Sequence, residues 1–262
     1  MRGQASVCHD ARMPTTGSSL PAPALEATAA FSAGSVLSRG FSVWTSNLTL
    51  FVGVSLVCYL PMLLVPAPDP ANPASTLTSS LATMVLAMVI GPLVSGAVIR
   101  GVFEQLRGGR SGFADSLRVA FRALWRMFAT TFLAGIIVGF FTLLLIVPGI
   151  MKFCSYYVAI PVAVVEGSGA SVSISRSKAL AAGFRWHLFG IILVATLLGM
   201  AVGACAGVVF RSFSGPLQTL LVTVIPNAIV GSLGAVFSGV AYYQLRVVKE
   251  GIDIEQLAAV FD

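Results

Sequence analysis

Charged residues are scarce in this chain, and long stretches of it contain none. Only 10% of its 262 residues are Asp, Glu, Lys or Arg, whereas 56% are hydrophobic. A water-soluble domain of this length needs more polar surface than such a composition supplies. The composition therefore excludes an ordinary soluble protein and indicates that lipid covers much of the surface.

The residue types on which most metal and enzyme sites depend are also few. Two histidines, His9 and His187, are too few for a metal cluster, and the four cysteines are far apart without a CxxC pair. The sequence has no Gly-rich phosphate loop ending in Lys, no HExxH and no GxSxG. We therefore predict a protein that is not an enzyme and that holds no cofactor and no metal.

Six apolar stretches are long enough to be considered as transmembrane helices, which predicts an all-α integral membrane protein. The fourth stretch reaches only about 24 Å as a helix, so it must thin the ~30 Å hydrocarbon core or be re-entrant. None of the six contains a clear titratable residue at mid-span, which argues against proton-coupled transport. The six stretches are 47–65, 81–99, 128–147, 150–165, 188–210 and 217–243.

The basic residues lie in alternate gaps between these stretches, which predicts the orientation of the chain. With six spans and a cytoplasmic N-terminus, 14 of the 16 Lys and Arg residues are cytoplasmic, and only Lys152 and Arg211 are external. A re-entrant fourth stretch would reverse everything after it and fit the positive-inside rule less well. We therefore expect both termini in the cytoplasm of a bacterium, with the protein in its cytoplasmic (inner) membrane. The expected divisions are a disordered cytoplasmic tail (1–30), a six-helix membrane domain (31–248) and a short cytoplasmic C-terminal segment (249–262).

Tryptophans mark a repeated pattern on the cytoplasmic side. Trp44, Trp125 and Trp186 each precede an odd-numbered span and follow a segment able to form an interfacial amphipathic helix. In the middle copy, apolar side chains from Phe113 to Phe128, Phe121 among them, share one face, with the arginines opposite. We predict three hairpins, each preceded by such a helix, with the tryptophans as interfacial anchors; alternatively, Trp and Arg simply mark the membrane interface.

Glycine and proline suggest where spans pack or break. Two sets of glycines have the four-residue spacing that lets a neighbouring helix approach closely: Gly135 and Gly139, and Gly199, Gly203 and Gly207. We predict that they pack helices within the protein; the alternatives are self-association of two copies or a narrow pathway.

Pro226 and Asn227 lie near the middle of the sixth span. There the amide of Asn227 forms either a helix-to-helix hydrogen bond or the lining of a small polar cavity.

Several of the basic residues are candidate contacts for lipid headgroups or partner proteins. Glu166 follows the fourth span, and nearby basic residues predict a salt-bridged cytoplasmic loop that is either structural or a docking site. Because the cations lie where anionic headgroups are, we expect anionic lipids, a membrane protein or a second copy as partners, and no nucleic acid. The candidate contacts are Arg118, Arg122, Arg126, Glu166, Arg176, Lys178 and Arg185.

The stretch from VPGI through YYVAIPVAVVEG to SRSKALAAGFRW, with the later YYQLRVVKEG, resembles a family of bacterial inner-membrane proteins. That family is similar to the multi-span membrane domain fused to some glycerophosphodiester phosphodiesterases. The resemblance covers most of the chain after about residue 30, but Val147 stands where a leucine is usual. It implies the membrane module alone and transfers no catalytic residue.

These observations together favour a lipid-facing scaffold or a partner of other envelope proteins. A permease or channel-like component that uses the proline-broken helices is the alternative.

Overall fold

The computed structural model describes residues 31–66, 72–106 and 113–251. These residues form helices joined by short turns, and no strand occurs among them. The expected N-terminal tail, and the C-terminal segment after Gly251, lie outside the described residues. The elements are α2 (Ala33–Ser46), α3 (Leu48–Tyr59), η1 (Leu60–Leu64), α4 (Pro73–Leu106), α5 (Phe113–Leu144), α6 (Ile146–Tyr156), α7 (Ala159–Val165), α8 (Ala170–Ala181), α9 (Arg185–Val209), α10 (Gly215–Thr219), η2 (Leu220–Val224, a π-helical turn) and α11 (Ile225–Glu250).

The all-helical class predicted from the sequence is confirmed for the described residues. Within the described part of the chain, five helical segments are long and apolar enough to cross a membrane. A sixth is obtained if α2 and the α3–η1 segment, which meet at 84°, count as one bent span. The bend falls at Asn47, whose backbone leaves the helical region and whose side-chain amide donates to Gln105 Oε1 on α4.

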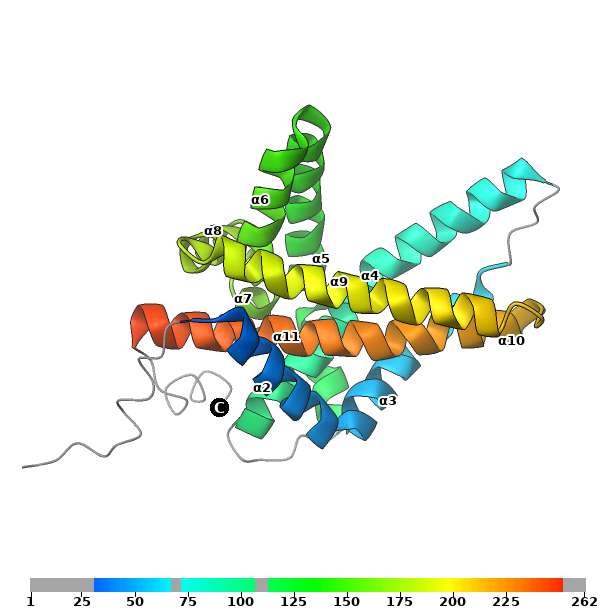
Figure 1. Cartoon of the computed structure of the whole chain (residues 1–262), viewed down its shortest axis with the longest axis horizontal. Helices are drawn as coiled ribbons and strands as arrows, with labels where there is room; N and C mark the ends of the chain where they lie inside the picture. Colours follow the sequence, from blue (N-terminus) through cyan, green and yellow to red (C-terminus); the bar gives the residue numbers. More distant parts are fainter. Residues whose placement is uncertain (1–30, 67–71, 107–112, 252–262) are drawn as a thin grey trace, which may run out of the picture.

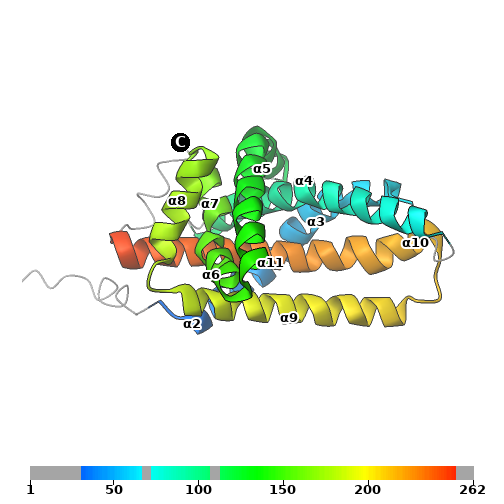
Figure 2. The same ribbon diagram turned by 90° about the horizontal axis from the view of Figure 1, so that it is seen from above.

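The spans divide into an inner and an outer group. In each of α4, α6–α7 and α10–α11, 44% of the most apolar window is buried inside the protein. In each of α5 and α9 the buried share is only 11%. Helix α11 lies at the centre of the molecule, with α9 antiparallel beside it and α2, α3 and α4 around it (Figures 1 and 2). The outer helices therefore have most of their apolar surface available for lipid.

The α5–α6 hairpin diverges from this arrangement. Along its first half α5 packs against α4, where Gly96 leaves room: a Cβ there would lie 2.6 Å from Met127 Cε. Farther along, α5 and α6 pair with each other and cross α9 and α11 at a steep angle (Figures 1 and 2). At the tip of the hairpin, Gly149 packs directly against Thr142.

Helix α2 differs from the predicted interfacial helix because it packs along α11. Gly40 lies against the ring of Phe237, which leaves no space for a Cβ. Nearer the start of α2, Ser35 Oγ donates to Gln244 Oε1 at 3.1 Å, and Arg39 lies over the ring of Tyr243. The contacts extend along α11, so α2 is fixed to the protein and does not lie free in the headgroup layer.

Of the other two predicted surface helices, one is not separate and one is. The segment 113–128 is not a separate element, because α5 runs from Phe113 to Leu144 without a break. The third corresponds to α8, which is separated from α9 by a turn in which Gly183 has a φ of +90°. Helix α8 packs against α5, α6 and α7.

Candidate functional site

A closed ring of polar side chains joins three parts of the chain at one end of the molecule. Glu166 Oε1, just after α7, accepts hydrogen bonds from Arg176 Nε (3.3 Å) and from Tyr242 Oη (3.0 Å). Arg246 Nη1 donates to Tyr242 Oη at 3.2 Å, and its Nε donates to Glu250 Oε2 at 2.8 Å. Arg176 Nη2 pairs with the other oxygen of Glu250, which closes the ring.

The ring neutralises its own charges. It contains two carboxylates and two guanidinium groups, and all four are at least half withdrawn from solvent. Such groups are stabilised only when they are paired, so these side chains hold α7, α8 and α11 together and are not free for a ligand. The sequence predicted the pairing of Glu166 with a nearby arginine, but it gave no signal for Tyr242, Arg246 or Glu250.

Two further cations next to the ring are used within the protein. Arg126 Nη1 donates to the carbonyl of Gly167 at 2.8 Å, and Lys249 Nζ donates to the carbonyl of Ala179 at 2.6 Å. Gly167 has a φ of +63°, a backbone conformation that favours glycine. These bonds fasten the turn after α7 and the end of α8 to α5 and α11.

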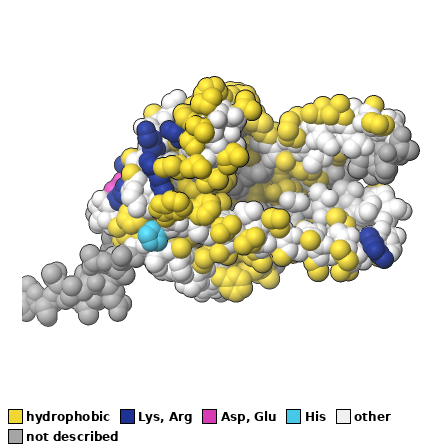
Figure 3. All heavy atoms as spheres, turned by 45° about the horizontal axis from the view of Figure 1, so that its top comes forward, with side chains coloured by type: hydrophobic (Ala, Val, Ile, Leu, Met, Phe, Trp, Pro, Cys, Tyr) yellow, Lys and Arg dark blue, Asp and Glu magenta, His cyan; other side chains and the backbone are white. Residues whose placement is uncertain are grey.

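The remaining predicted contacts form an unneutralised surface, which we call the basic end. Arg118 and Arg122 on α5 and Lys178 on α8 are exposed, and no ion pair is found for them among the described residues. Arg185, at the start of α9, is half-buried, and its buried Nε has no hydrogen-bond partner in the described structure. Figure 3 shows Lys and Arg side chains gathered at one end, with a separate basic patch at the other.

Two of the predicted aromatic anchors are next to this surface. Trp125 is 76% exposed and Trp186 is 82% exposed, as expected of side chains that face lipid at an interface. Trp125 stacks on Phe128, which in turn stacks on Phe132, so α5 carries an outward aromatic stripe.

The buried face of α5 differs from the apolar face predicted for it. Ala120, Ala123 and Met127 face the protein, whereas Phe121 is more than half exposed. Small side chains pack against α4 at this point because Gly96 lets the helices approach closely. The predicted apolar face is thus divided between protein and surroundings.

Trp44 is not a lipid-facing anchor in this structure. It is half-buried against the core, and its Nε1–H donates to Ser232 Oγ at 3.0 Å. Ser232 lies about 21 Å from Arg246 along the axis of α11. Trp44 therefore connects α2 to the first third of α11, well away from the basic end.

The glycines predicted to pack helices mostly do not. A Cβ added at Gly135, Gly139, Gly203 or Gly207 would meet nothing within 4 Å, and only Gly199 of that set has a close neighbour, Val230 Cγ1 at 3.0 Å. Helices α5 and α9 are the outer helices, and of these glycines Gly135 and Gly199 line a cavity between helices. The close approaches occur instead at glycines on other helices: Gly40, Gly96, Gly149 and Gly231.

Neither predicted role for Asn227 corresponds to its geometry. Its Nδ2 donates to the carbonyl of Thr223 at 2.7 Å, within its own helical segment. The residues just before Pro226 form a π-helical turn, where regular backbone bonding changes register. The amide of Asn227 thus satisfies a local carbonyl, and among the described residues its exposed side chain forms no helix-to-helix bond.

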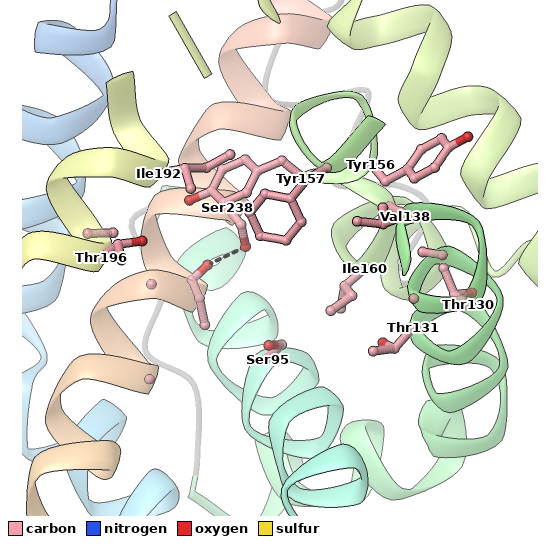
Figure 4. A pocket seen from close by; sticks show the side chains of 18 of the residues that line it. Ser95, Thr130, Thr131, Val138, Tyr156, Tyr157, Ile160, Ile192, Thr196 and Ser238 are labelled. Carbon is pink, nitrogen blue, oxygen red and sulfur yellow. Dashed lines mark hydrogen bonds between the residues drawn. The ribbon is translucent and has the colours of Figure 1, made fainter. Parts of the chain in front are cut away.

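A cavity of about 590 Å³ lies among α4, α5, α6–α7, α9 and α11, and sequence reasoning missed it. Ala134, Val138, Ile160, Ile192 and Val230 give it a mainly apolar wall. Figure 4 shows Thr130 and Thr131 on α5 and Ser95 on α4, with Tyr157 extending toward α9 and α11. Spans far apart in sequence build this wall, so a single sequence offers no signal for it. The polar side chains that line the cavity are Ser95, Thr130, Thr131, Tyr156, Tyr157, Thr196 and Ser238.

No group of His, Cys, Asp and Glu suited to holding a metal is found among the described residues. Comparisons of this chain with protein-family models, with curated proteins and with solved structures find no match. The resemblance to the membrane domain of glycerophosphodiester phosphodiesterases therefore stays a prediction from the residues.

Proposed function

We propose that this chain is a non-catalytic, multi-span protein of a bacterial inner membrane that acts as a lipid-facing scaffold for other membrane proteins or for a second copy. The basic end is the part that binds anionic headgroups of the cytoplasmic leaflet. The observation that carries this proposal is the division of charge at that end. Glu166 and Glu250 are used in the ring, whereas Arg118, Arg122 and Lys178 remain exposed without an ion pair in the described structure.

Exposed aromatic side chains support a membrane surface as the partner. Trp125 and Trp186 accompany the exposed cations, and indole rings favour the headgroup level of a bilayer. Each cation near an anionic surface contributes about 1 kcal/mol of attraction, which salt weakens.

The proposed orientation places the basic end and both termini in the cytoplasm. Two observations support a re-entrant α5–α6 hairpin that enters from and returns to that side. Val147 on α6 and Arg185 on α9 line one cavity of about 450 Å³, so the hairpin tip lies near the cytoplasmic end of α9. In addition, α5 after Arg126 is only about 27 Å long, less than the ~30 Å hydrocarbon core.

The test uses the full-length protein in vesicles that contain spin-labelled phosphatidylglycerol or phosphatidylcholine. We expect the wild type to select phosphatidylglycerol, and we expect Arg118→Gln, Arg122→Gln and Lys178→Gln together to reduce that selectivity at least fivefold. The charge-preserving triple variant, Arg118→Lys, Arg122→Lys and Lys178→Arg, should retain it. Equal association of both lipids with the wild type would contradict the proposal.

Transport through the proline-broken helices has less support, because Asn227 bonds within its own segment and Pro226 is buried. Saturable solute uptake by reconstituted protein that is lost in Asn227→Leu would favour a permease. A scaffold should tolerate this substitution.

A further inference from the structure

Another cavity, of about 450 Å³, lies where α6 passes the beginning of α9 (Figure 2). We call it the α6–α9 cavity. Its wall is mainly apolar: Val147, Ile150 and Met151 come from α6, and the rings of Trp186 and Phe189 come from α9. The volume is within the usual range for ligand pockets, about 300–1,000 Å³.

Arg185 brings one positive charge to this apolar wall. It is the only charged residue in the described lining of the cavity, and its side chain is half-buried. Its Nε–H is buried, and no hydrogen bond or ion pair is found for the guanidinium among the described residues. The two terminal nitrogens remain accessible. Because a partly desolvated cation is costly without a counter-charge, this guanidinium indicates that an anion binds at its terminal nitrogens.

The start of α9 adds a second attraction for an anion. Helix α9 begins at Arg185, and no side chain caps its first N–H groups. These N–H groups and the positive end of the helix dipole favour negative charge at this point, as they do in many phosphate sites. The guanidinium and the helix start therefore attract the same anion.

The wall indicates that the anion belongs to a membrane lipid. Val147 and Met151 are exposed at the edge of the cavity, so the apolar wall continues onto the outer surface of α6. Figure 3 shows hydrophobic side chains directly beside the basic ones at this end of the molecule. A soluble phosphate compound would leave this wall uncovered, whereas an acyl chain attached to the phosphate would cover it.

The charge of the lining favours an anionic lipid over a zwitterionic one. Neither Asp nor Glu is found in the described lining of the cavity. Glu166 and Glu250, the carboxylates of the ring, are already paired with arginines. The ammonium group of a choline or ethanolamine lipid would therefore have no counter-charge here, so a headgroup with net negative charge fits better.

We infer that the α6–α9 cavity binds one anionic glycerophospholipid, with its phosphate at the terminal nitrogens of Arg185 and the first part of an acyl chain against α6 and Phe189. The inference deepens the proposed function and rests on it for the leaflet from which the lipid comes. It differs in predicting a single retained lipid at a defined site, separate from the general attraction of the exposed cations.

The experiment counts retained lipid. Full-length protein in mild detergent is titrated with palmitoyl-oleoyl phosphatidylglycerol or palmitoyl-oleoyl phosphatidylcholine, and the first bound molecule is measured by native mass spectrometry. One net charge contributes about fivefold in affinity, so phosphatidylglycerol should bind about fivefold more tightly or better. Glycerol phosphate, which has no acyl chain, should not displace it. Oleic acid should bind more weakly, because its single chain covers less of a wall built from two helices.

Charge variants then locate the phosphate. Arg185→Gln should weaken the binding of phosphatidylglycerol at least tenfold, because charge-assisted hydrogen bonds are lost. Arg211→Gln, exposed beyond the other end of α9, removes the same charge and should leave the binding unchanged. The triple Gln variant of Arg118, Arg122 and Lys178 should also retain the lipid, which separates this site from the exposed cations.

A second pair of variants locates the acyl chain. Ile150→Trp should fill the apolar part of the cavity and weaken the binding at least fivefold. Val194→Trp, on the exposed surface of α9 and outside the described lining of the cavity, is the matched control and should not change it.

Four outcomes would overturn the inference: equal binding of the two phospholipids by the wild type, displacement by glycerol phosphate, tighter binding of oleic acid, or binding that is insensitive to Arg185→Gln. The first three use unmodified protein, so they remain informative if a variant fails to fold. Selectivity in vesicles without a retained lipid here would overturn this inference and leave the proposed function standing. A retained lipid that depends on Arg185, without selectivity in vesicles, would support the site and contradict the general attraction.

Discussion

Two helix-to-helix turns in this molecule show opposite surfaces. The turn from α9 to α10 exposes Arg211, Ser212 and Ser214, and it ends at Gly215 with a φ of +66°. The turn from α5 to α6 exposes only apolar side chains: Leu143 is 90% exposed, and the next four residues are each more than 60% exposed. A turn of the first kind suits water, whereas five consecutive exposed apolar residues need a hydrocarbon environment.

The backbone of the apolar turn is also suited to hydrocarbon, where unpaired polar groups are costly. The N–H of Leu145 donates to the carbonyl of Phe141 at 2.9 Å, and its own carbonyl accepts from Gly149 at 3.2 Å. Pro148, in the first turn of α6, has no N–H to leave unpaired. The Val-Pro-Gly segment therefore reduces the number of unsatisfied groups at the tip.

The largest expected difference between the two turns is their accessibility. In a cysteine-free background, Ser214→Cys should react with an impermeant thiol reagent in intact spheroplasts, and Leu145→Cys should not. Ser171→Cys, exposed on α8, should also stay unlabelled until the membrane is opened. Labelling of Leu145→Cys to the same extent as Ser214→Cys would place the hairpin tip outside and restore the six-span topology.

A charge should also distinguish the two turns. Arginine costs about 2.5–3.5 kcal/mol at the centre of a membrane-spanning helix on insertion scales and less toward the interface, so at the hairpin tip, near the cytoplasmic end of α9, we expect a smaller cost. Leu144→Arg should therefore lower the fraction of protein integrated into membranes, measured by carbonate extraction, about threefold or more. Ser212→Arg, in the turn that already exposes Arg211, is the matched control and should integrate normally.

The sequence predicted the helices well because apolar runs and missing charges are local properties. Their ends were less predictable. Helix α4 begins at Pro73, well before the predicted apolar run, because Asn72 Oδ1 accepts the N–H of Ala74 and caps a Ser- and Thr-rich first part. Helix α5 likewise joins a polar and an apolar segment that composition had separated.

Long-range partners were beyond a single sequence. The pairing of Glu166 with Arg176 connects residues close in the chain, so a charge pattern revealed it. Tyr242 and Glu250 come from the last helix and complete the ring only through packing. The cavity has the same origin, since five separate segments build its wall.

Among the predicted packing glycines, only Gly199 has a close neighbour in the described structure, for a related physical reason. Four-residue spacing indicates a flat helix face, but it does not identify what covers that face. Gly139 is open, whereas Gly149, which belongs to no such stripe, has the tightest surroundings in its hairpin.

The smallest expected effect is a change in stability when Gly149 or Gly139, both in the α5–α6 hairpin, is replaced by alanine. A Cβ at position 149 would lie 2.7 Å from Thr142 Cα, a backbone atom that cannot rotate away, so Gly149→Ala should separate α5 from α6 and cost about 1–3 kcal/mol. At position 139 a Cβ meets open space, and alanine there should stabilise the helix by up to about 1 kcal/mol. Unfolding of both variants in detergent, followed by circular dichroism, should therefore shift in opposite directions. Equal shifts would mean that the two helices do not approach closely at the tip, and the proposed hydrocarbon-buried turn would lose its packing basis.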